Sequence, residues 1–464
     1  MREAAVSLGS DEELAGPPRV ATPTKRGDRI SSLDVLRGFA LLGILVVNIE
    51  DFGGPEALHD IPVGTAKVTF AGPHAHWNLV ILLLKWIFVE GKMRGLFSML
   101  FGAGAVLLTS RIERRSSADN AADIFLRRNM WLVALGFLHG TFLWTGDVLF
   151  AYGFNALLFL YPCRKLKAKT LFIAGTIVWV GVATAGLMRV LGSFDHIHLA
   201  RQVSAISAEQ GAGKALTPEE KKIQQQWQAT VAQNAAPSAK DVKAKVAEGH
   251  QGYSGFLQHK GANFLEHTGH YESAFGFTET LGPMLIGMAL LKSGFLTAEL
   301  SISTYLWTAI AGFLVSTPLY IIALWKAYLS NFYFLVLDEW VNSTYHIAGE
   351  AGTIAIAATL LFVIKSGTVR SLLRPFAAVG QTALSNYLLT SFLCQMVFVF
   401  GPWKLYGELE YHQLLYVVFS VWAVNLLVSP LWLRVFEFGP CEWLWRSLTY
   451  WKLQPMRLRR EETH

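Results

Sequence analysis

The sequence predicts an all-α, polytopic integral membrane protein with about ten transmembrane helices and both termini in the cytoplasm. Of its 464 residues, 52% are hydrophobic and only 16% are charged, whereas a soluble domain carries about 25% charged residues. Apolar runs of membrane length recur along the chain, and basic residues gather in the short connections between them. This composition excludes a set of soluble domains. The net charge of +6 does not indicate nucleic-acid binding, because its basic residues lie where orientation signals belong.

The N-terminal part of the chain is expected to hold a polar tail and five crossings. Residues 1–28 are polar and contain Pro17 and Pro18, which predicts a disordered cytoplasmic tail. A transmembrane bundle follows over residues 29–191, because its apolar stretches approach the roughly 20 residues that span a bilayer. Residues 77–89 are predicted to be interfacial or re-entrant, since the sequence EGKMRG interrupts the helix after them. The expected crossings are residues 30–50, 93–109, 125–144, 148–162 and 170–191.

The remainder is expected to form an outer loop, five more crossings and a basic tail. Residues 192–272 are hydrophilic and predict an extracytoplasmic loop, in which Thr217 and Pro218 mark the start of an exposed helix. Residues 441–464 are basic and aromatic, which is typical of a cytoplasmic segment lying on the membrane surface. A second bundle, residues 273–440, contains expected crossings at 273–291, 302–324, 346–364, 376–400 and 414–436.

The basic residues of the short connections predict the orientation. With ten crossings they fall on one side of the membrane, and the opposite short loops hold only a few lysines. The positive-inside rule then places this side, with both termini, in the cytoplasm. Lys92 and Arg94 depart from the pattern, because they fall at the outer end of the second crossing, where they are either interfacial or functional.

Two ionisable residues stand in the leading turns of the first crossing. Asp34 and Arg37 are three residues apart, so they share a helix face and can pair. Ionisable side chains in hydrocarbon cost a few kcal/mol, about 2.5–3.5 at the helix centre. The pair is either a structural ion pair at the cytoplasmic edge or the charged lining of a site between helices. At the other end of the same helix, Asn48 is expected to face an outer cavity.

A second group of polar residues is expected to cluster at the outer depth of the membrane. His139 ends one crossing and Asp147 begins the next, while His346 and Glu350 share a helix face at i and i+4. Such clusters line water-filled cavities, although a single helical His is often a packing residue. The group comprises His74, His139, Asp147, Glu279, His346 and Glu350.

The chemistry that this group favours is proton transfer. A histidine oriented by a carboxylate can deprotonate a hydroxyl or an amine. The chain has no GxSxG or SxxK nucleophile motif, so Ser98, Ser385 and Ser391 are interpreted as ordinary helix serines. Asn386 lies in mid-membrane, where it either bridges helices by hydrogen bonds or lines a site. No metal site and no tightly bound cofactor are expected.

Six motifs in their order resemble the YeiB-like membrane proteins, which carry the domain of unknown function 418. The resemblance covers nearly the whole chain from Arg29 to Arg457 and implies a multi-pass protein of the bacterial inner (plasma) membrane. The motifs are RISSLDVLRGFALLGILVVN, VEGKMRGLFSMLFGAGAVLL, RRNMWLVALGFLHGTFLWTGDVLFAYG, LGPMLIGMALLKSGFL, VGQTALSNYLLTSF and FGPCEWLWRSLTYWKLQPMR.

The family is grouped with transmembrane acyltransferases, including the lysosomal heparan-glucosaminide N-acetyltransferase. In that enzyme the catalytic His lies in an HAPWN-type sequence on the non-cytosolic side. Residues 74–78 read HAHWN, so the resemblance assigns the catalytic role to His74, with His76 in place of the Pro. The same resemblance implies a cytoplasmic acyl-CoA, such as acetyl-CoA, as the co-substrate.

The leading hypothesis is therefore a membrane acyltransferase with an extracytoplasmic carbohydrate or lipid acceptor. His74 or His139 is expected to act as the base, with Asp147 orienting a histidine. The phosphates of the donor are expected to meet Arg37, Arg127 and Arg128. The alternatives are a transporter for a small solute or lipid and a structural membrane protein. Membrane lipids are the expected partners, a homo-oligomer is left open, and nucleic acid is excluded.

Overall fold

The computed structural model describes residues 31–55, 58, 73–235, 237–264, 266 and 274–458, with the backbone alone over 183–193 and 274–278. Every named element in these residues is a helix, which confirms the all-α prediction. Six helical stretches are long and apolar enough to cross a membrane. The protein is thus a polytopic membrane protein, while the count of ten crossings and the cytoplasmic termini stay predictions. The tail predicted over residues 1–28 lies outside the described residues.

The first helices follow the predicted boundaries closely. Helix α1 spans Ser31–Gly53, and α4 (Ala75–Phe88) is separated from α5 (Lys92–Arg115) by a turn. The turn ends at Gly91, whose φ of 71° is a left-handed conformation that favours glycine. The predicted interruption at EGKMRG is therefore confirmed. Next come α6 (Ala118–Phe142), α7 (Leu149–Asn155), the π-helix η2 (Ala156–Leu160) and α8 (Tyr161–Cys163).

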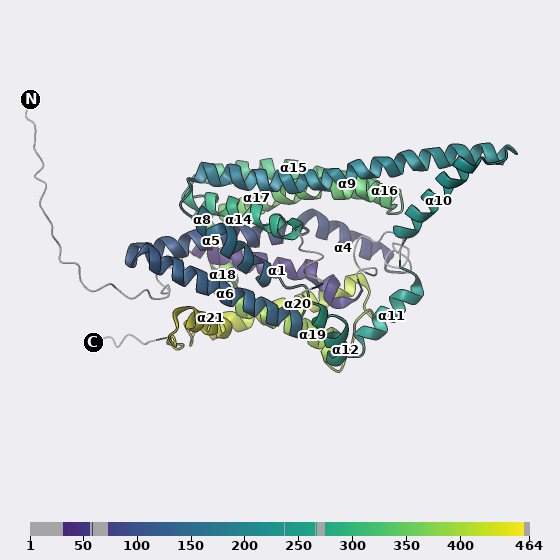
Figure 1. Cartoon of the computed structure of the whole chain (residues 1–464). Coiled ribbons are helices and arrows are strands. Elements are labelled where there is room, and N and C mark those ends of the chain that lie inside the picture. The colour runs from purple at the N-terminus through teal and green to yellow at the C-terminus, as the bar shows by residue number, and fades with distance from the viewer. Residues whose placement is uncertain are drawn as a thin grey trace, which may run out of the picture.

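Helix α9 (Ala168–Gly211) is far longer than expected. The crossing was predicted to end at Leu191, but the helix continues for another 20 residues into the hydrophilic segment. It stops where Gly211 and Gly213 flank one alanine, and Gly213 has a φ of 88°. Figure 1 shows α9 projecting beyond the bundle, with α10 beside it. A long polar stretch without an early helix-breaking signal can extend a membrane helix into water.

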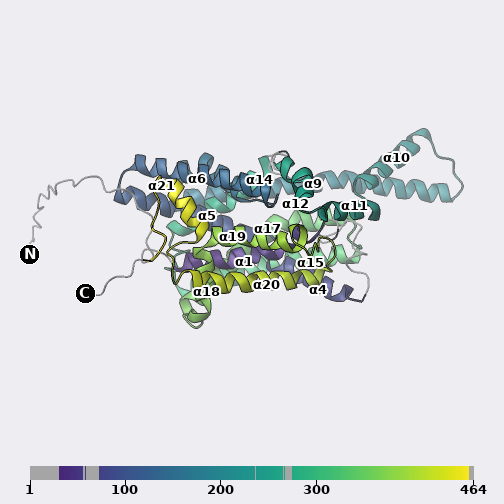
Figure 2. The same cartoon turned by 90° about the horizontal axis from the view of Figure 1, so that it is seen from below.

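The hydrophilic segment after α9 is mostly helical. Helix α10 (Pro218–Gln233) starts with Thr217 as N-cap, and Thr217 and Glu220 form a reciprocal capping box. This confirms the helix expected from the Thr-Pro signal. The chain continues through α11 (Ala239–Gly249), α12 (Tyr253–His259) and the short η3 (Gly261–Asn263). Both views place α10 at the end of the bundle opposite α21 (Figures 1 and 2).

The C-terminal helices match the predicted segments with two differences. The eighth expected crossing begins earlier, because α16 and η4 run directly into α17. The ninth is divided at Thr382 into α18 and α19. The elements are α14 (Ala274–Lys292), α15 (Ile302–Leu329), α16 (Phe334–Val336), η4 (Leu337–Asn342), α17 (Ser343–Ser366), α18 (Arg370–Gln381), α19 (Ala383–Gln395), η5 (Met396–Phe400), α20 (Tyr411–Trp432) and α21 (Pro440–Tyr450).

Helices from the two predicted bundles pack directly on one another. Helix α1 lies against α18, and α14 lies against both α9 and α5. A Cβ added at Gly38 would lie 1.9 Å from the carbonyl oxygen of Phe376, and one at Gly380 would lie 1.9 Å from that of Asp34. The two backbones thus touch through small residues, as membrane helices often do. This contact fixes the start of α1, with Asp34, beside α18.

Candidate functional site

The chain turns sharply after α6 and returns Asp147 to the end of that helix. The backbone N–H groups of Leu143 and Trp144 both donate to the carbonyl of His139 at 2.9 Å, closing the helix end. His139 Nδ1 then lies 2.8 Å from Asp147 Oδ2. The other oxygen of Asp147 accepts the backbone N–H of Phe150 at 2.8 Å. The predicted neighbours His139 and Asp147 are therefore in contact, and their side chains are only 1% and 0% exposed.

A serine from a distant helix completes this group. Ser391 Oγ, on α19, lies 3.0 Å from His139 Nε2, although the residues are 252 positions apart. With the Nδ1 proton donated to Asp147, Nε2 can accept from the Ser391 hydroxyl, which also lies 3.2 Å from the backbone carbonyl of Tyr387 as a second acceptor. Nucleophile, base and orienting carboxylate thus follow in the order required for activating a hydroxyl. We call Ser391, His139 and Asp147 the relay. This contact of Ser391 with His139 was not predicted from the sequence.

Tyr387 connects the relay to a cavity. It lies one helical turn before Ser391, and its ring centroid is 4.9 Å from that of His139. Its hydroxyl donates to Asp147 Oδ2 at 3.4 Å and accepts the backbone N–H of Val148 at 3.3 Å. The same side chain forms part of the wall of a cavity of about 240 Å³. The side chain of Tyr387 therefore lies between the relay and this cavity.

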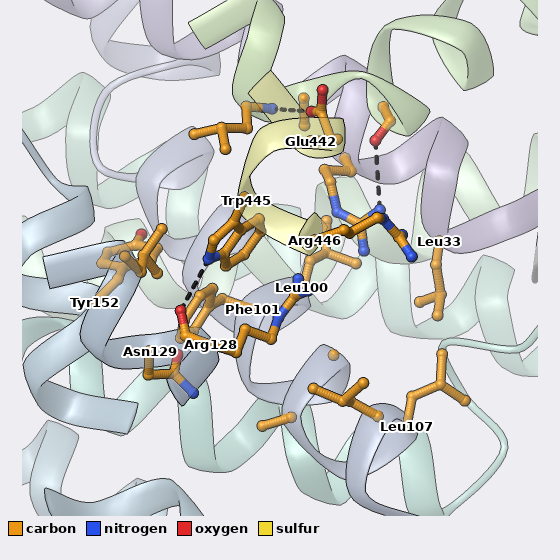
Figure 3. Close-up of a pocket in the computed structure, with 18 of the residues that line it drawn as sticks. Leu33, Leu100, Phe101, Leu107, Arg128, Asn129, Tyr152, Glu442, Trp445 and Arg446 are labelled. Atoms are coloured by element: carbon orange, nitrogen blue, oxygen red, sulfur yellow. Dashed lines mark hydrogen bonds between the residues drawn. The ribbon is translucent and has the colours of Figure 1, made fainter. Parts of the chain in front are cut away.

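The cavity has an apolar wall and several arginines, and we call it the arginine cavity. Figure 3 shows Arg128 and Arg446 extending into the space beside Leu100, with Tyr152 and Phe101 also in the lining. Two acids, Asp34 and Glu442, face the same space. Four arginines against two carboxylates leave positive charge in a largely hydrophobic chamber. The arginines are Arg37, Arg111, Arg128 and Arg446.

Helix α21 forms one side of the arginine cavity. The guanidinium of Arg128 stacks 3.6 Å from the ring centroid of Trp445, and the indole N–H of Trp445 donates to the carbonyl of Arg128 at 2.8 Å. Arg37 pairs with Asp34 at 3.0 Å, which confirms the predicted pairing. The aromatic C-terminal segment, expected on the membrane surface, thus packs against α6 and walls a cavity.

Glu442 of α21 caps the start of α19, the helix that carries Ser391. Its Oε1 accepts the backbone N–H groups of Leu384 at 2.6 Å and Ser385 at 3.2 Å, and the Ser385 hydroxyl donates to its Oε2. Negative charge is favoured at a helix N-terminus. Burial nevertheless raises the pKa of Glu442 above its ordinary value of 4.5. One buried carboxyl therefore joins the C-terminal helix to the relay helix.

This raised pKa predicts a pH-dependent stability. Because the folded pKa of Glu442 exceeds its unfolded value, its contribution is fully present below about pH 4.5 and is lost as the pH rises through the folded pKa. Glu442→Gln removes this titration, so the variant should lose less stability than the wild type between pH 4.5 and 8. Thermal unfolding in detergent across this range measures it. Glu219→Gln, an exposed site on α10, is the control. Equal pH slopes for wild type and Glu442→Gln would contradict the assignment.

Gly136 allows α7 to approach α6 closely enough for the His139–Asp147 contact. A Cβ at this position would lie 2.3 Å from the backbone nitrogen of Phe150 and 2.6 Å from Asp147 Oδ1. Gly136→Ala should therefore destabilise the fold by about 1–3 kcal/mol, the usual cost of overpacking. Gly181→Ala has open space around it and should be neutral or stabilising. A chemical-unfolding comparison of both variants checks this, and equal stabilities would refute it.

Four other predicted residues gather in a smaller group beside the cavity. Arg94 pairs with Glu279, and His346 Nδ1 lies 3.9 Å from the same carboxylate. Glu350 lines the same small hollow of about 20 Å³. Ser98, also in its lining, makes a 2.6 Å hydrogen bond with the hydroxyl of Tyr152 in the arginine cavity. The predicted cluster is therefore divided: Glu279, His346 and Glu350 gather here with Arg94, whereas His139 and Asp147 form a separate pair and His74 contacts Glu410.

The remaining predicted residues lie away from the relay. The contacts of His74 in the described structure are with Glu410 and His412, not with His139. Arg127 pairs with Asp123 on its own helix and does not line the arginine cavity.

Asn48 is half-buried on α1 and does not line the arginine cavity either. Asn386 donates to Thr382 Oγ1 and to Ser429 Oγ, both at 2.8 Å. Because Ser429 lies on α20, Asn386 bridges two helices. This confirms the interpretation of Asn386 as a residue that joins helices by hydrogen bonds.

A buried ion network at the C-terminal ends of α1 and α4 was not predicted. Lys85 Nζ lies 2.8 Å from Glu50 Oε1 and 3.2 Å from Glu90 Oε2. Tyr411 donates to Glu50, and Tyr345 donates to Glu90 at 3.1 Å. The Lys85 side chain is 3% exposed. Glu50 was visible as the last residue of a predicted crossing, but Lys85 was hidden inside an apolar segment.

Together these features define a polytopic α-helical membrane protein with a buried Ser–His–Asp relay beside an arginine-lined cavity. Residues 290–452 match the family model described as "Protein of unknown function (DUF418)". The Uncharacterized protein YeiB of Escherichia coli (strain K12) is 31% identical over 91% of this chain and 96% of its own length. The chain therefore belongs to the YeiB-like DUF418 family.

Two other relatives match this chain over a similar share of their length. The Uncharacterized protein YxaH of Bacillus subtilis (strain 168) is 28% identical over 94% of this chain and 97% of its own length. An uncharacterized 39.9 kDa protein of Bacillus acidopullulyticus is 26% identical over 95% of this chain and 99% of its own. No solved structure matches the chain.

Proposed function

We propose that the protein is a membrane acyltransferase in which His139 acts as general base and Ser391 as the first acyl acceptor. The observation that carries this proposal is the relay, which meets the arginine cavity through Tyr387. A hydroxyl held 3.0 Å from an oriented imidazole is arranged for deprotonation. The resemblance to transmembrane acyltransferases points to the same reaction class.

The arginine cavity fits a donor with phosphates at one end and an acyl thioester at the other. Guanidinium groups bind phosphates through paired hydrogen bonds, and Arg128 and Arg446 stand in the same chamber as apolar side chains. Arg128 and His139 are both on α6, 11 residues apart, which is about 16 Å of helix rise. With its phosphates near Arg128, the acyl arm of an acyl-CoA would run along α6 toward Tyr387, the side chain between this cavity and the relay. By the positive-inside rule this donor enters from the cytoplasm.

The proposed reaction has two steps, in which the acyl group moves first to Ser391 and then to the acceptor. First, the Ser391 hydroxyl gives its proton to His139 Nε2 while Oγ attacks the thioester carbonyl. The C–S bond breaks, and the thiolate of CoA takes the proton from His139. Second, the hydroxyl or amine of a carbohydrate or lipid acceptor gives its proton to His139 and attacks the acyl-serine ester. The Ser391 oxygen leaves and recovers that proton. Asp147 holds the imidazolium in both steps.

The proposal is tested with labelled acetyl-CoA and the purified full chain in nanodiscs. Release of free CoA, or label retained on the protein, should occur with wild type and with His259→Ala, which changes an exposed histidine of α12. His139→Ala should abolish both signals. Equal turnover by His139→Ala and wild type would overturn the proposal.

Transport is the second candidate, because the buried Glu50–Lys85–Glu90 network has the character of an ion pathway. The two functions separate in liposomes. Substrate-dependent flux without consumption of acyl-CoA, unchanged by Ser391→Ala, identifies a transporter.

A further inference from the structure

The starts of α4 and α20 bring together three metal-ligand side chains that the proposed reaction does not use. His74 precedes α4, while Glu410 precedes α20 and His412 lies in its first turn. His74 Nδ1 is 3.1 Å from both carboxylate oxygens of Glu410, and His412 Nδ1 is 3.4 Å from Glu410 Oε2. One ligand atom from each residue lies within 4.8 Å of the other two.

A buried asparagine fixes the relative position of these two helix ends. Asn78, 3% exposed on α4, accepts the backbone N–H of His412 at 3.0 Å. The same Oδ1 accepts the Nδ1–H of His412 at 3.1 Å, which leaves Nε2 as the ligand atom of this imidazole. This amide ties α20 to α4 and orients the imidazole, as outer hydrogen-bond partners do for metal-bound histidines. Since Gln413 and Glu410 form a capping box, the carboxylate is also held in place.

The donor set suits a divalent transition metal. Two imidazoles and one carboxylate are ligands that zinc accepts, with water in a fourth position. The side chains of His74 and Glu410 are 48% and 44% exposed, so a hydrated cation can reach them.

We propose that His74, Glu410 and His412 form a zinc-binding site that joins α4 to α20. The assignment gives His74 a metal-binding role in place of the catalytic role implied by the HAHWN resemblance. It is independent of the acyl-transfer proposal, because the described contacts of these residues do not include Ser391, His139 or Asp147. Failure of either proposal therefore leaves the other standing.

Metal binding to the purified full chain in detergent tests the proposal. Zinc affinity is measured by competition with a fluorescent chelator, and Co²⁺ serves as a spectroscopic probe of coordination. Wild type should bind one zinc ion in competition with the chelator and give the visible spectrum of tetrahedral Co²⁺. His74→Ala and His412→Ala should each weaken zinc binding at least roughly tenfold, because loss even of an outer partner costs about 10–100-fold.

The matched control is His76→Ala, which removes an exposed histidine two residues along from His74. On a helix, residues two apart do not face each other, so this variant should keep wild-type affinity. If His412→Ala fails to fold, the comparison of wild type with His74→Ala decides, since His74 is half exposed. Equal affinity of these two proteins, or equal losses in His74→Ala and His76→Ala, would overturn the site.

Discussion

Asp147→Asn is expected to lower acyl transfer by about 10²–10⁴-fold, the contribution of an oriented general base. The amide keeps the size of the carboxylate but removes the charge that accepts the Nδ1 proton of His139. The imidazole then loses its preferred tautomer, and Nε2 no longer presents a lone pair to Ser391. Steady-state release of CoA by the protein in nanodiscs measures the loss. Donor affinity should change little, because Asp147 does not line the cavity that holds the arginines.

The same assay distinguishes Ser391 from an ordinary serine. Ser391→Ala should abolish turnover, since it removes the first acyl acceptor. Ser420→Ala is the matched control, because Ser420 is exposed on α20 and, among the residues that the structure describes, its hydroxyl bonds only the carbonyl of Tyr416 one turn back, at 2.7 Å. Turnover by Ser391→Ala at the wild-type rate would remove Ser391 from the reaction. Unchanged turnover by Asp147→Asn would show that the relay does not take part in the reaction.

Lys85→Met is expected to destabilise the fold by about 3–5 kcal/mol, the cost of leaving a buried ion without its partner. Lys85 pairs with two carboxylates, and its side chain is 3% exposed while those of Glu50 and Glu90 are each 11% exposed. Removing the ammonium leaves two mostly buried carboxylates without the cation that pairs with both. Chemical unfolding in detergent, monitored by tryptophan fluorescence, gives the free energy.

Two further variants test whether the loss of stability in Lys85→Met comes from the buried ion network. Lys214→Met breaks an exposed ion pair with Glu209, whose side chains are 61% and 52% exposed, and should leave the unfolding free energy unchanged. Adding Glu50→Gln and Glu90→Gln to Lys85→Met removes the unpaired charges and should restore much of the stability. Equal stability of Lys85→Met and Lys214→Met would mean that the network is solvated and costs nothing to break.

The parts of the fold that sequence predicts well are those decided by local chemistry. The first helix follows from one apolar run, and the Asp34–Arg37 pair follows from a spacing of three residues. The cap of α10 follows from Thr217 and Pro218. The contact of His139 with Asp147 also needs only eight residues and one tight turn. Each of these features depends on residues close together in the chain, so hydrophobic periodicity and turn chemistry are enough to predict it.

The missed parts depend on packing between distant helices. Ser391 contacts His139 across 252 residues, and the sequence of a membrane helix does not indicate which distant residue a serine in it contacts. Lys85 meets Glu50 in the same way, because hydropathy counted the segment around it as apolar. One signal for Ser391 existed in the spacing of Tyr387 and Ser391, which places two hydroxyls on one face of a mid-membrane helix. Without the depth and rotation of that helix, however, the face could not be assigned to a partner.

The acyl-serine is the claim on which this account depends most directly. The full chain in nanodiscs is mixed with acetyl-CoA, quenched in acid and digested, and the peptide containing Ser391 is measured by mass spectrometry. We predict that one acetyl group appears on Ser391 in the wild type and is absent from the same peptide in His139→Ala. An unmodified Ser391 peptide in wild type, under conditions in which CoA is released, would contradict the account.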